Sequence, residues 1–345
     1  MANVLDLRRR IRSVKNTRQI TKAMKMVSAA RLRRAQERAL ASRPMGQMLI
    51  NLLESLISRT ELVDRETGLP KHPLLEQRPE TNTLLILITG DRGLAGAFNS
   101  NVLKAAMRFG EVKRGKNIDI AVVGRKGRDF LRRRFPTRAP DSDERAGQIE
   151  IIDKYVGLLG KLEFENVSEA ADEIVKRYSR GQLDSVYLLF NEFRSVIAQR
   201  VIVQRLLPVQ EIGRREVTHA EELSLAERER MGEAARSAGI SLKEPEPSEL
   251  ERQAVKFGTL PVDYIYEQPP EELFASILPR YVAIEIFQAM LESVAAEHAA
   301  RMTAMDSATN NANEVIDSLT LNLNRVRQAA ITKEIIEIVS GAAAL

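Results

Sequence analysis

Three glycines at positions 90, 93 and 96 form the segment of this sequence that is nearest to a known chemical motif. The run Gly90-Asp91-Arg92-Gly93-Leu94-Ala95-Gly96 lies between an apolar run typical of a buried strand (83–89) and a helix-like stretch (101–109). Glycines at such a turn can expose backbone N–H groups to a phosphate. The spacing is G-x-x-G-x-x-G, however, whereas dinucleotide-binding turns have G-x-G-x-x-G. We therefore favour a structural turn, and a nucleotide-dependent α/β enzyme stays as the alternative.

Side chains that commonly perform catalysis or bind metals are scattered along the chain. His72, His219 and His298 show no metal-ligand spacing, and the absence of cysteine excludes thiolate chemistry and disulfides. The adjacent carboxylates Glu221 and Glu222 fall in a highly charged segment, and no G-x-S-x-G motif accompanies the serines. The sequence predicts no catalytic residue, no metal site and no cofactor.

The first 45 residues are strongly basic. They hold thirteen Lys and Arg against Asp6 and Glu37, a net charge of +11, whereas the whole chain carries only +5. Such a segment can neutralise phosphates, and a nucleic-acid binder would lose affinity steeply as salt rises. It lacks interleaved aromatic residues and also carries a regular apolar stripe that must be buried. We therefore expect no nucleic-acid partner and interpret the charge as a solvated face or a surface for an acidic protein.

The two ends of the chain have the pattern of long helices that pack on each other. Apolar residues recur at helical spacing from Val4 onward, and residues 1–60 are predicted as one coiled-coil helix. Residues 270–345 are predicted as a second such helix, with a run of alanines between 295 and 312 that would allow close packing. The second helix is acidic where the first is basic, so the two are electrostatically matched.

The middle of the chain alternates between strand-like and helix-like stretches. Residues 80–210 are therefore predicted as a small Rossmann-like α/β domain with a largely parallel sheet. Residues 215–260 are predicted as a charged insertion on the surface, partly flexible, with one short helix near 225–238. We expect neither a signal peptide nor a membrane-spanning segment, because no apolar run is long enough.

Several longer motifs resemble the gamma subunits of bacterial F-type ATP synthases. They occur in the family's order and cover nearly the whole chain except the segment around 218–254. The runs are Arg12–Ser28 (RSVKNTRQITKAMKMVS), Asp91–Asn99 (DRGLAGAFN), Val123–Phe130 (VGRKGRDF), Arg280–Val282, Ala300–Met302, Arg327–Glu334 (RQAAITKE) and Glu337–Gly341.

The resemblance implies a shaft of two antiparallel helices with the α/β domain at its foot. Such a shaft would transmit torque from an ion-driven membrane ring, the c-ring, to a ring of alpha and beta subunits that makes ATP. The chain itself would be non-catalytic, would also bind the epsilon subunit, and would lie at the cytoplasmic face of the inner membrane, associated with the membrane only through its partners. For the segment 215–260 the resemblance leaves two roles open, a brake on reverse rotation and a passive loop.

The resemblance also implies two sets of contact residues. The residues expected to meet the alpha/beta ring are Met24, Lys25, Arg301, Gln328, Thr332 and Glu337. The residues expected to meet the membrane rotor ring are Tyr264, Tyr266 and Glu267.

Overall fold

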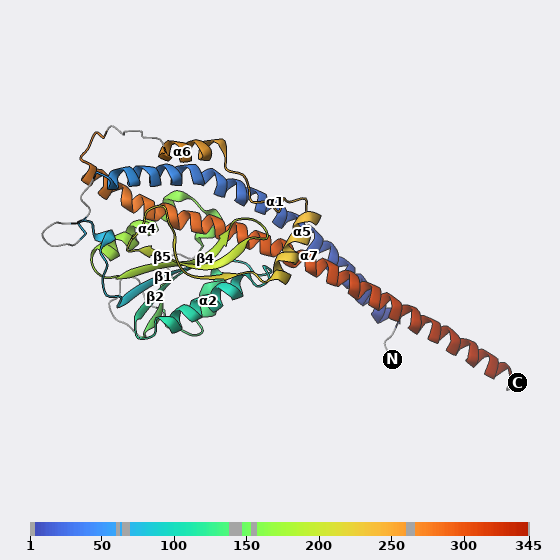
Figure 1. The fold of residues 1–345 in the computed structure, drawn as a ribbon. Coiled ribbons are helices and arrows are strands. Elements are labelled where there is room, and N and C mark those ends of the chain that lie inside the picture. The colour runs from blue at the N-terminus through green and yellow to red at the C-terminus, as the bar shows by residue number, and fades with distance from the viewer. Residues whose placement is uncertain are drawn as a thin grey trace.

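The elements alternate between helix and strand in the middle of the chain and are long and helical at its ends (Figure 1). The computed structural model describes residues 4–59, 63, 70–137, 147–152, 157–259 and 266–343. Its elements are α1 (Val4–Ile57), η1 (Pro73–Leu75), β1 (Asn82–Ile88), α2 (Phe98–Val112), β2 (Asn117–Val123), α3 (Arg125–Leu131), β3 (Ile149–Ile152), η3 (Leu158–Lys161), α4 (Phe164–Ser179), β4 (Ser185–Phe193), β5 (Gln199–Leu207), β6 (Glu216–Glu222), α5 (Leu225–Ser237), α6 (Glu249–Thr259) and α7 (Pro270–Ala343).

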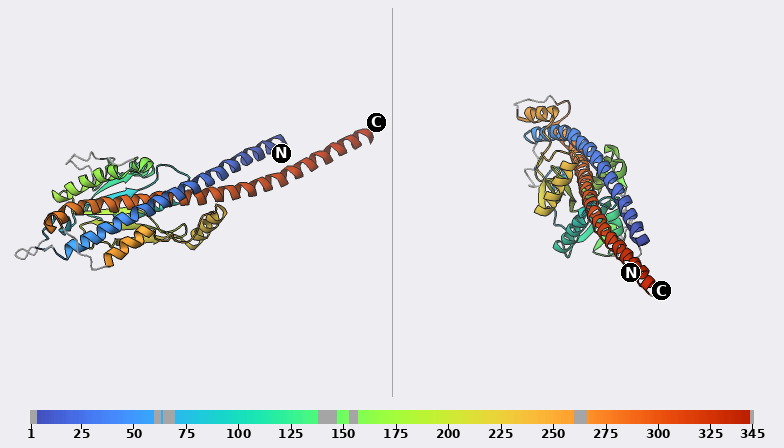
Figure 2. Two further views of the ribbon diagram at one scale, coloured as in Figure 1. Left: turned by 90° about the horizontal axis from the view of Figure 1, so that it is seen from above. Right: turned by 90° about the vertical axis from the view of Figure 1, so that its right-hand side faces the viewer.

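The terminal helices α1 and α7 form the long axis of the molecule. They contain 54 and 74 residues, so at 1.5 Å per residue α7 is about 110 Å long. Each contains one internal proline, Pro44 in α1 and Pro279 in α7, and the helix continues through both. The α/β domain lies beside one half of the pair, and the other half extends away from it with the C-terminus at the tip (Figures 1 and 2). The expected coiled-coil and α/β fold class is confirmed.

Small and polar residues set the antiparallel register of α1 and α7. The alanines at 295, 296 and 299 are fully buried beside Leu32, which allows the close approach that the alanine run predicted. Farther out, the Thr21 and Thr309 hydroxyls lie 2.8 Å apart, and Arg18 Nη1 donates to Asn313 Oδ1 over 3.1 Å. This register places the start of α1 beside about residue 326 of α7. The last part of α7 therefore has no α1 residue beside it.

The sheet has the strand order β3-β2-β1-β4-β5-β6. Strands β1 to β4 pair in parallel, and β5 and β6 are antiparallel. Alternate residues of β1 face two different cores: Leu84 and Ile86 pack with α4 and α7, whereas Leu85 and Leu87 pack with α2. The sheet is thus sandwiched between α7 and α4 on one face and α2 on the other (Figure 1). Strands β3 and β6 were not anticipated from the sequence.

The segment 215–260 is more ordered than the expected surface insertion. Its first part is strand β6, which pairs with β5. Helix α5 begins with a capping box in which Ser224 and Glu227 bond each other's backbone N–H, and it buries Met231 against the α1–α7 pair. Helix α6 lies on α1, where Asn51 Nδ2 donates to the Ala254 carbonyl over 2.7 Å. The short helix predicted near 225–238 is α5, whereas the polar composition concealed β6 and α6.

Within the described residues, one helix has the length and apolar composition that could cross a membrane. It is α7, and 61% of its most apolar window is buried inside the protein against α1 and the sheet. Its apolarity is that of a core helix.

Gly124, at the end of β2, should tolerate no side chain. Its φ is +103°, and an added Cβ would lie 1.9 Å from the Thr89 carbonyl oxygen. Gly115 has a similar φ of +92° but open space around it. We expect Gly115→Ala to lower the free energy of unfolding by about 1 kcal/mol, from backbone strain alone, and Gly124→Ala to lower it by at least about 3 kcal/mol. Urea unfolding of both variants checks this, and equal costs would contradict it.

Candidate functional site: a shaft and its partner surfaces

The glycine turn after β1 is held by the chain's own side chains. Asn99 Oδ1 accepts the N–H of Gly90 at 2.8 Å, and Leu94 takes a φ of +65°. An added Cβ at Gly90 would lie 2.7 Å from Glu297 Oε1 of α7, so a side chain here would have to displace that carboxylate. The turn thus has the structural role favoured from its spacing.

Helix α7 also covers the place where sheets of this topology bind ligands. The order of strands reverses between β1 and β4, and such switch points usually hold the ligand. Here Ser293 Oγ of α7 accepts the N–H of Asn191, in β4, at 3.2 Å. Arg301 Nη2 lies 3.4 Å from the carbonyl oxygen of Gly93, in the turn, and is also paired with Glu297. These contacts hold α7 against β4 and the glycine turn at the switch point.

Beside this contact lies a cavity of about 640 Å³ that is lined by arginines from several elements. We call it the arginine groove: Arg31, Arg34 and Arg38 of α1, Arg92 of the glycine turn and Arg125 of α3. None of these five guanidinium groups forms an ion pair with another described residue. Unpaired cations held together in a concave surface fit an acidic partner. The sequence signal for this surface was the charge excess of the first 45 residues, but spacing did not identify the residues.

His298 of α7 also lines the arginine groove. Burial, together with the neighbouring guanidinium groups of Arg301 and Arg31, lowers the pKa of His298 to about 4. Arg301 Nη1 lies 3.3 Å from His298 Nδ1, which can accept this hydrogen bond only while the ring is neutral. His298 is therefore neutral at pH 7 and adds no charge to the groove.

The lowered pKa of His298 predicts a loss of stability in mild acid. The unfolded chain binds a proton at this residue as the pH falls below about 6.5, whereas the folded chain resists it down to about 4. The His298 contribution therefore destabilises the fold below pH 6.5 and vanishes above it. Between pH 7.5 and 5, His298→Gln should lose about 2 kcal/mol less stability than the wild type in urea unfolding. Identical losses in both proteins would contradict the assignment.

Two of the residues expected to meet the alpha/beta ring are buried within the chain. Lys25 Nζ donates to Asp306 Oδ1 at 2.5 Å and to Ser237 Oγ of α5 at 2.6 Å. Arg301 is 8% exposed and paired with Glu297. Met24 is half-buried beside them. The sequence could not indicate the burial of Lys25, because Ser237 and Asp306 are more than 200 positions away along the chain. The contact of Lys25 with a ring subunit stays a prediction.

The end of α7 is exposed on all sides. Gln328, Thr332 and Glu337, which were predicted to meet the ring, lie here, and Thr332 bonds only the Gln328 carbonyl one turn earlier. Large apolar side chains lie among them, each about half exposed or more: Leu321, Ile331, Ile335, Ile336, Ile338 and Val339. Clustered exposed apolar residues of this kind mark an interaction site. We call residues 326–343 the tip.

Two of the residues predicted to meet the membrane rotor ring, Tyr266 and Glu267, lie at the opposite end of the molecule. Tyr266 packs on the core, its hydroxyl is 2.9 Å from Ser55 Oγ, and Arg59 lies over its ring at 5.3 Å. Glu267 is exposed. Tyr264 lies outside the described residues. Among the residues that the structure describes, no cluster of His, Asp and Glu could hold a metal ion.

The comparisons with known proteins cover the whole length of the chain. The sequence pattern of the ATP synthase family matches residues 3–345. The ATP synthase gamma chain of Solibacter usitatus is 44% identical over 344 residues, covering 100% of this chain and 99% of that one. The gamma chain of Geobacter metallireducens is 41% identical over 344 residues, covering 99% and 98%.

A solved structure has a similar fold. A rotor chain of the Euglena gracilis mitochondrial ATP synthase, in rotational state 1, matches with a TM-score of 0.50 and 18% identity, over 95% of this chain and 98% of that one. An α/β domain at one end of two antiparallel helices, one of which protrudes as an exposed tip, defines a stalk-like subunit of a larger assembly. The chain belongs to the family of ATP synthase gamma chains.

Proposed function

We propose that this chain is the central rotor shaft of an F-type ATP synthase. It transmits torque from the ion-driven membrane ring to the catalytic ring of alpha and beta subunits, so that ATP is made. The observation that carries the proposal is the tip, a helix that continues beyond its own partner with apolar side chains on its surface. A helix of this kind requires a surrounding partner, and a hollow ring of subunits provides one.

The shape of the molecule suits a rotor that acts through contact. The α/β domain lies to one side of the helix pair, so different sides of the molecule present different surfaces (Figure 2). As the shaft turns, each ring subunit meets the arginine groove at a different time. Contacts that favour one conformation of a subunit shift its equilibrium and thereby its affinity for nucleotide. The chain need not touch the nucleotide, and it supplies no catalytic group or cofactor.

We assign the arginine groove to an acidic segment of a ring subunit. Five unpaired guanidinium groups attract carboxylates and can bind them bidentately. Met24, Gln328, Thr332 and Glu337 are partly or fully exposed and suit contacts in the bore of the ring. Lys25 and Arg301 reach a partner only if their internal pairs with Asp306 and Glu297 exchange.

The end of the molecule that carries the α/β domain supplies the connection to the membrane. Tyr264, Tyr266 and Glu267 suit contacts with the polar loops of the c-ring, and the epsilon subunit binds the adjacent α/β domain. The chain is then peripheral, at the cytoplasmic face of the inner membrane, and it is attached to the membrane only through these partners.

Reconstitution tests the assignment. The purified chain is mixed with alpha and beta subunits of the same organism, and the mass of the complex and its ATP hydrolysis are measured. A complex of three alpha, three beta and one shaft subunit with faster hydrolysis than the subunits alone supports the proposal. A folded chain that associates with neither subunit contradicts it.

The alternative, a nucleotide-dependent enzyme, is tested by Gly93→Asp. An added Cβ at Gly93 would lie 3.7 Å from Lys126 Cε and 4.0 Å from Lys126 Nζ, both ordinary contacts, so the variant should fold. A new carboxylate in the turn would repel a phosphate. We expect that neither the wild-type chain nor Gly93→Asp binds ATP when isolated. If the wild type binds ATP and Gly93→Asp does not, the result favours the enzyme.

A further inference from the structure

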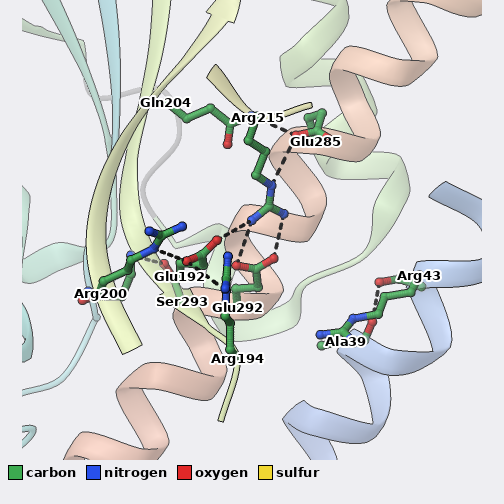
Figure 3. A network of polar contacts seen from close by, with 12 residues as sticks. Ala39, Arg43, Glu192, Arg194, Arg200, Gln204, Arg215, Glu285, Glu292 and Ser293 are labelled. Atoms are coloured by element: carbon green, nitrogen blue, oxygen red, sulfur yellow. Dashed lines mark hydrogen bonds and ion pairs between the residues drawn. The ribbon is translucent and has the colours of Figure 1, made fainter. Parts of the chain in front are cut away.

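An ionic network joins the α/β domain to α7 (Figure 3). Its centre is Arg215, immediately before β6. Arg215 Nη2 lies 2.7 Å from Glu292 Oε1, and Nη1 lies 3.2 Å from Glu292 Oε2. This two-pronged geometry fixes the direction of both side chains. Arg215 thereby connects the sheet to the face of the long helix that crosses it.

A second set of contacts supports this pair. Glu192 of β4 lies 3.7 Å from Arg215 Nη1 and is also bound by Arg200. Glu285 of α7 lies 3.7 Å from Arg215 Nε and accepts the Gln204 amide at 2.9 Å. The surrounding carboxylates raise the pKa of Arg215, and the arginines lower the pKa of Glu192. Arg215 and Glu192 are thus both charged at neutral pH.

The network lies where apolar contact between α1, α7 and the domain is interrupted. A cavity of about 400 Å³ opens there, lined by residues of α1, by Glu192 and Arg215, and by Glu292 of α7. Apolar clusters lie on both sides of it along α7, one around Met290 and the other around Ala295. At this level, directional polar bonds connect the domain to the helix.

We propose that Arg215 is a positioning residue that fixes the rotational position of the α/β domain about α7. Torque applied to the α/β domain would then reach the helix pair α1 and α7. Glu285 and Glu292 are seven residues apart, two helical turns, and therefore lie on one side of α7. Rotation of the domain about the axis of α7 moves Arg215 away from both carboxylates at once. This inference rests on the rotor function proposed above.

Torsional stiffness tests the inference. A complex of the full-length chain with its alpha/beta ring is immobilised, a probe is attached to the α/β domain, and its angular fluctuation is measured without nucleotide. Arg215→Met should increase the angular variance by about twofold or more. Arg215→Lys keeps the charge but cannot bond both oxygens of Glu292 with a planar guanidinium, and it should give an intermediate value. The matched control is Arg214→Met: its side chain is 83% exposed, and its one ion pair with a described residue is with Glu211, 3.5 Å away.

A paired substitution guards against misfolding, since Arg215→Met leaves carboxylates without their cation. Arg215→Met combined with Glu292→Met removes the central pair with its charge balance kept, and should also increase the angular variance. If both variants are as stiff as Arg214→Met, the inference is wrong although the rotor function stands. If the wild type itself does not assemble or rotate, the rotor function fails, and the inference fails with it.

Discussion

Replacing Arg31, Arg34 and Arg38 by glutamate should weaken binding of the chain to its alpha/beta ring by at least about 100-fold. Three unpaired cations of the arginine groove become anions, and even about 1 kcal/mol lost per reversed charge amounts to roughly 3 kcal/mol. The loss should be greatest at low salt, because screening reduces both the attraction in the wild type and the repulsion in the variant.

The same variant should fold normally. The three arginines have no ion pair among the described residues, so their replacement breaks none in the isolated chain and places carboxylates in the same cavity as Arg92 and Arg125. The control is Lys104→Glu with Arg133→Glu and Arg230→Glu, three exposed sites outside the groove with the same total change of charge. Binding curves at several salt concentrations measure the effect. Equal weakening by groove and control variants would show a general charge effect and contradict the proposed surface.

Ending the chain at Arg325 should shorten the lifetime of the complex by more than about tenfold. The truncation removes the tip, whose large apolar side chains each contribute on the order of 1.5 kcal/mol or more when a partner buries them. Thermal unfolding of the isolated chain should stay the same, because these side chains are exposed and lie beyond the start of α1.

Two measurements distinguish this result from damage to the fold. Ile331→Asp combined with Ile335→Asp leaves the length unchanged and should reproduce most of the shorter lifetime. Subunit exchange with a labelled chain gives the dissociation rate. A truncated chain that dissociates as slowly as the full chain would show that the tip is not an interface.

The helical pair and the class of the sheet could be predicted because each rests on a local pattern. Apolar spacing from Val4 onward and the alanines between 295 and 312 define two helices, and strand-like runs separated by helices define a Rossmann-like domain. The alanine run also predicted the close approach of the two helices, which is seen in the burial of Ala295, Ala296 and Ala299 with Leu32.

The partner surfaces could not be predicted because each combines distant segments. Arg38, Arg92 and Arg125 belong to three different elements, and only the folded chain brings them around one cavity. The ion pair of Lys25 with Asp306 and the bonds of Arg215 to α7 have the same origin. Strand β6 escaped notice because most of its side chains are exposed and polar, so the pairing with β5 leaves no apolar pattern.

The central claim is that the chain rotates within a ring of subunits. The most direct test fixes the alpha/beta ring to a surface, attaches a probe to the α/β domain at an exposed site such as Lys104, and records the probe angle while ATP is added. We predict rotation in one direction that depends on ATP, with three preferred angles that match the three alternating subunit pairs. A complex that assembles and hydrolyses ATP while the probe only fluctuates about one angle would contradict the rotor function.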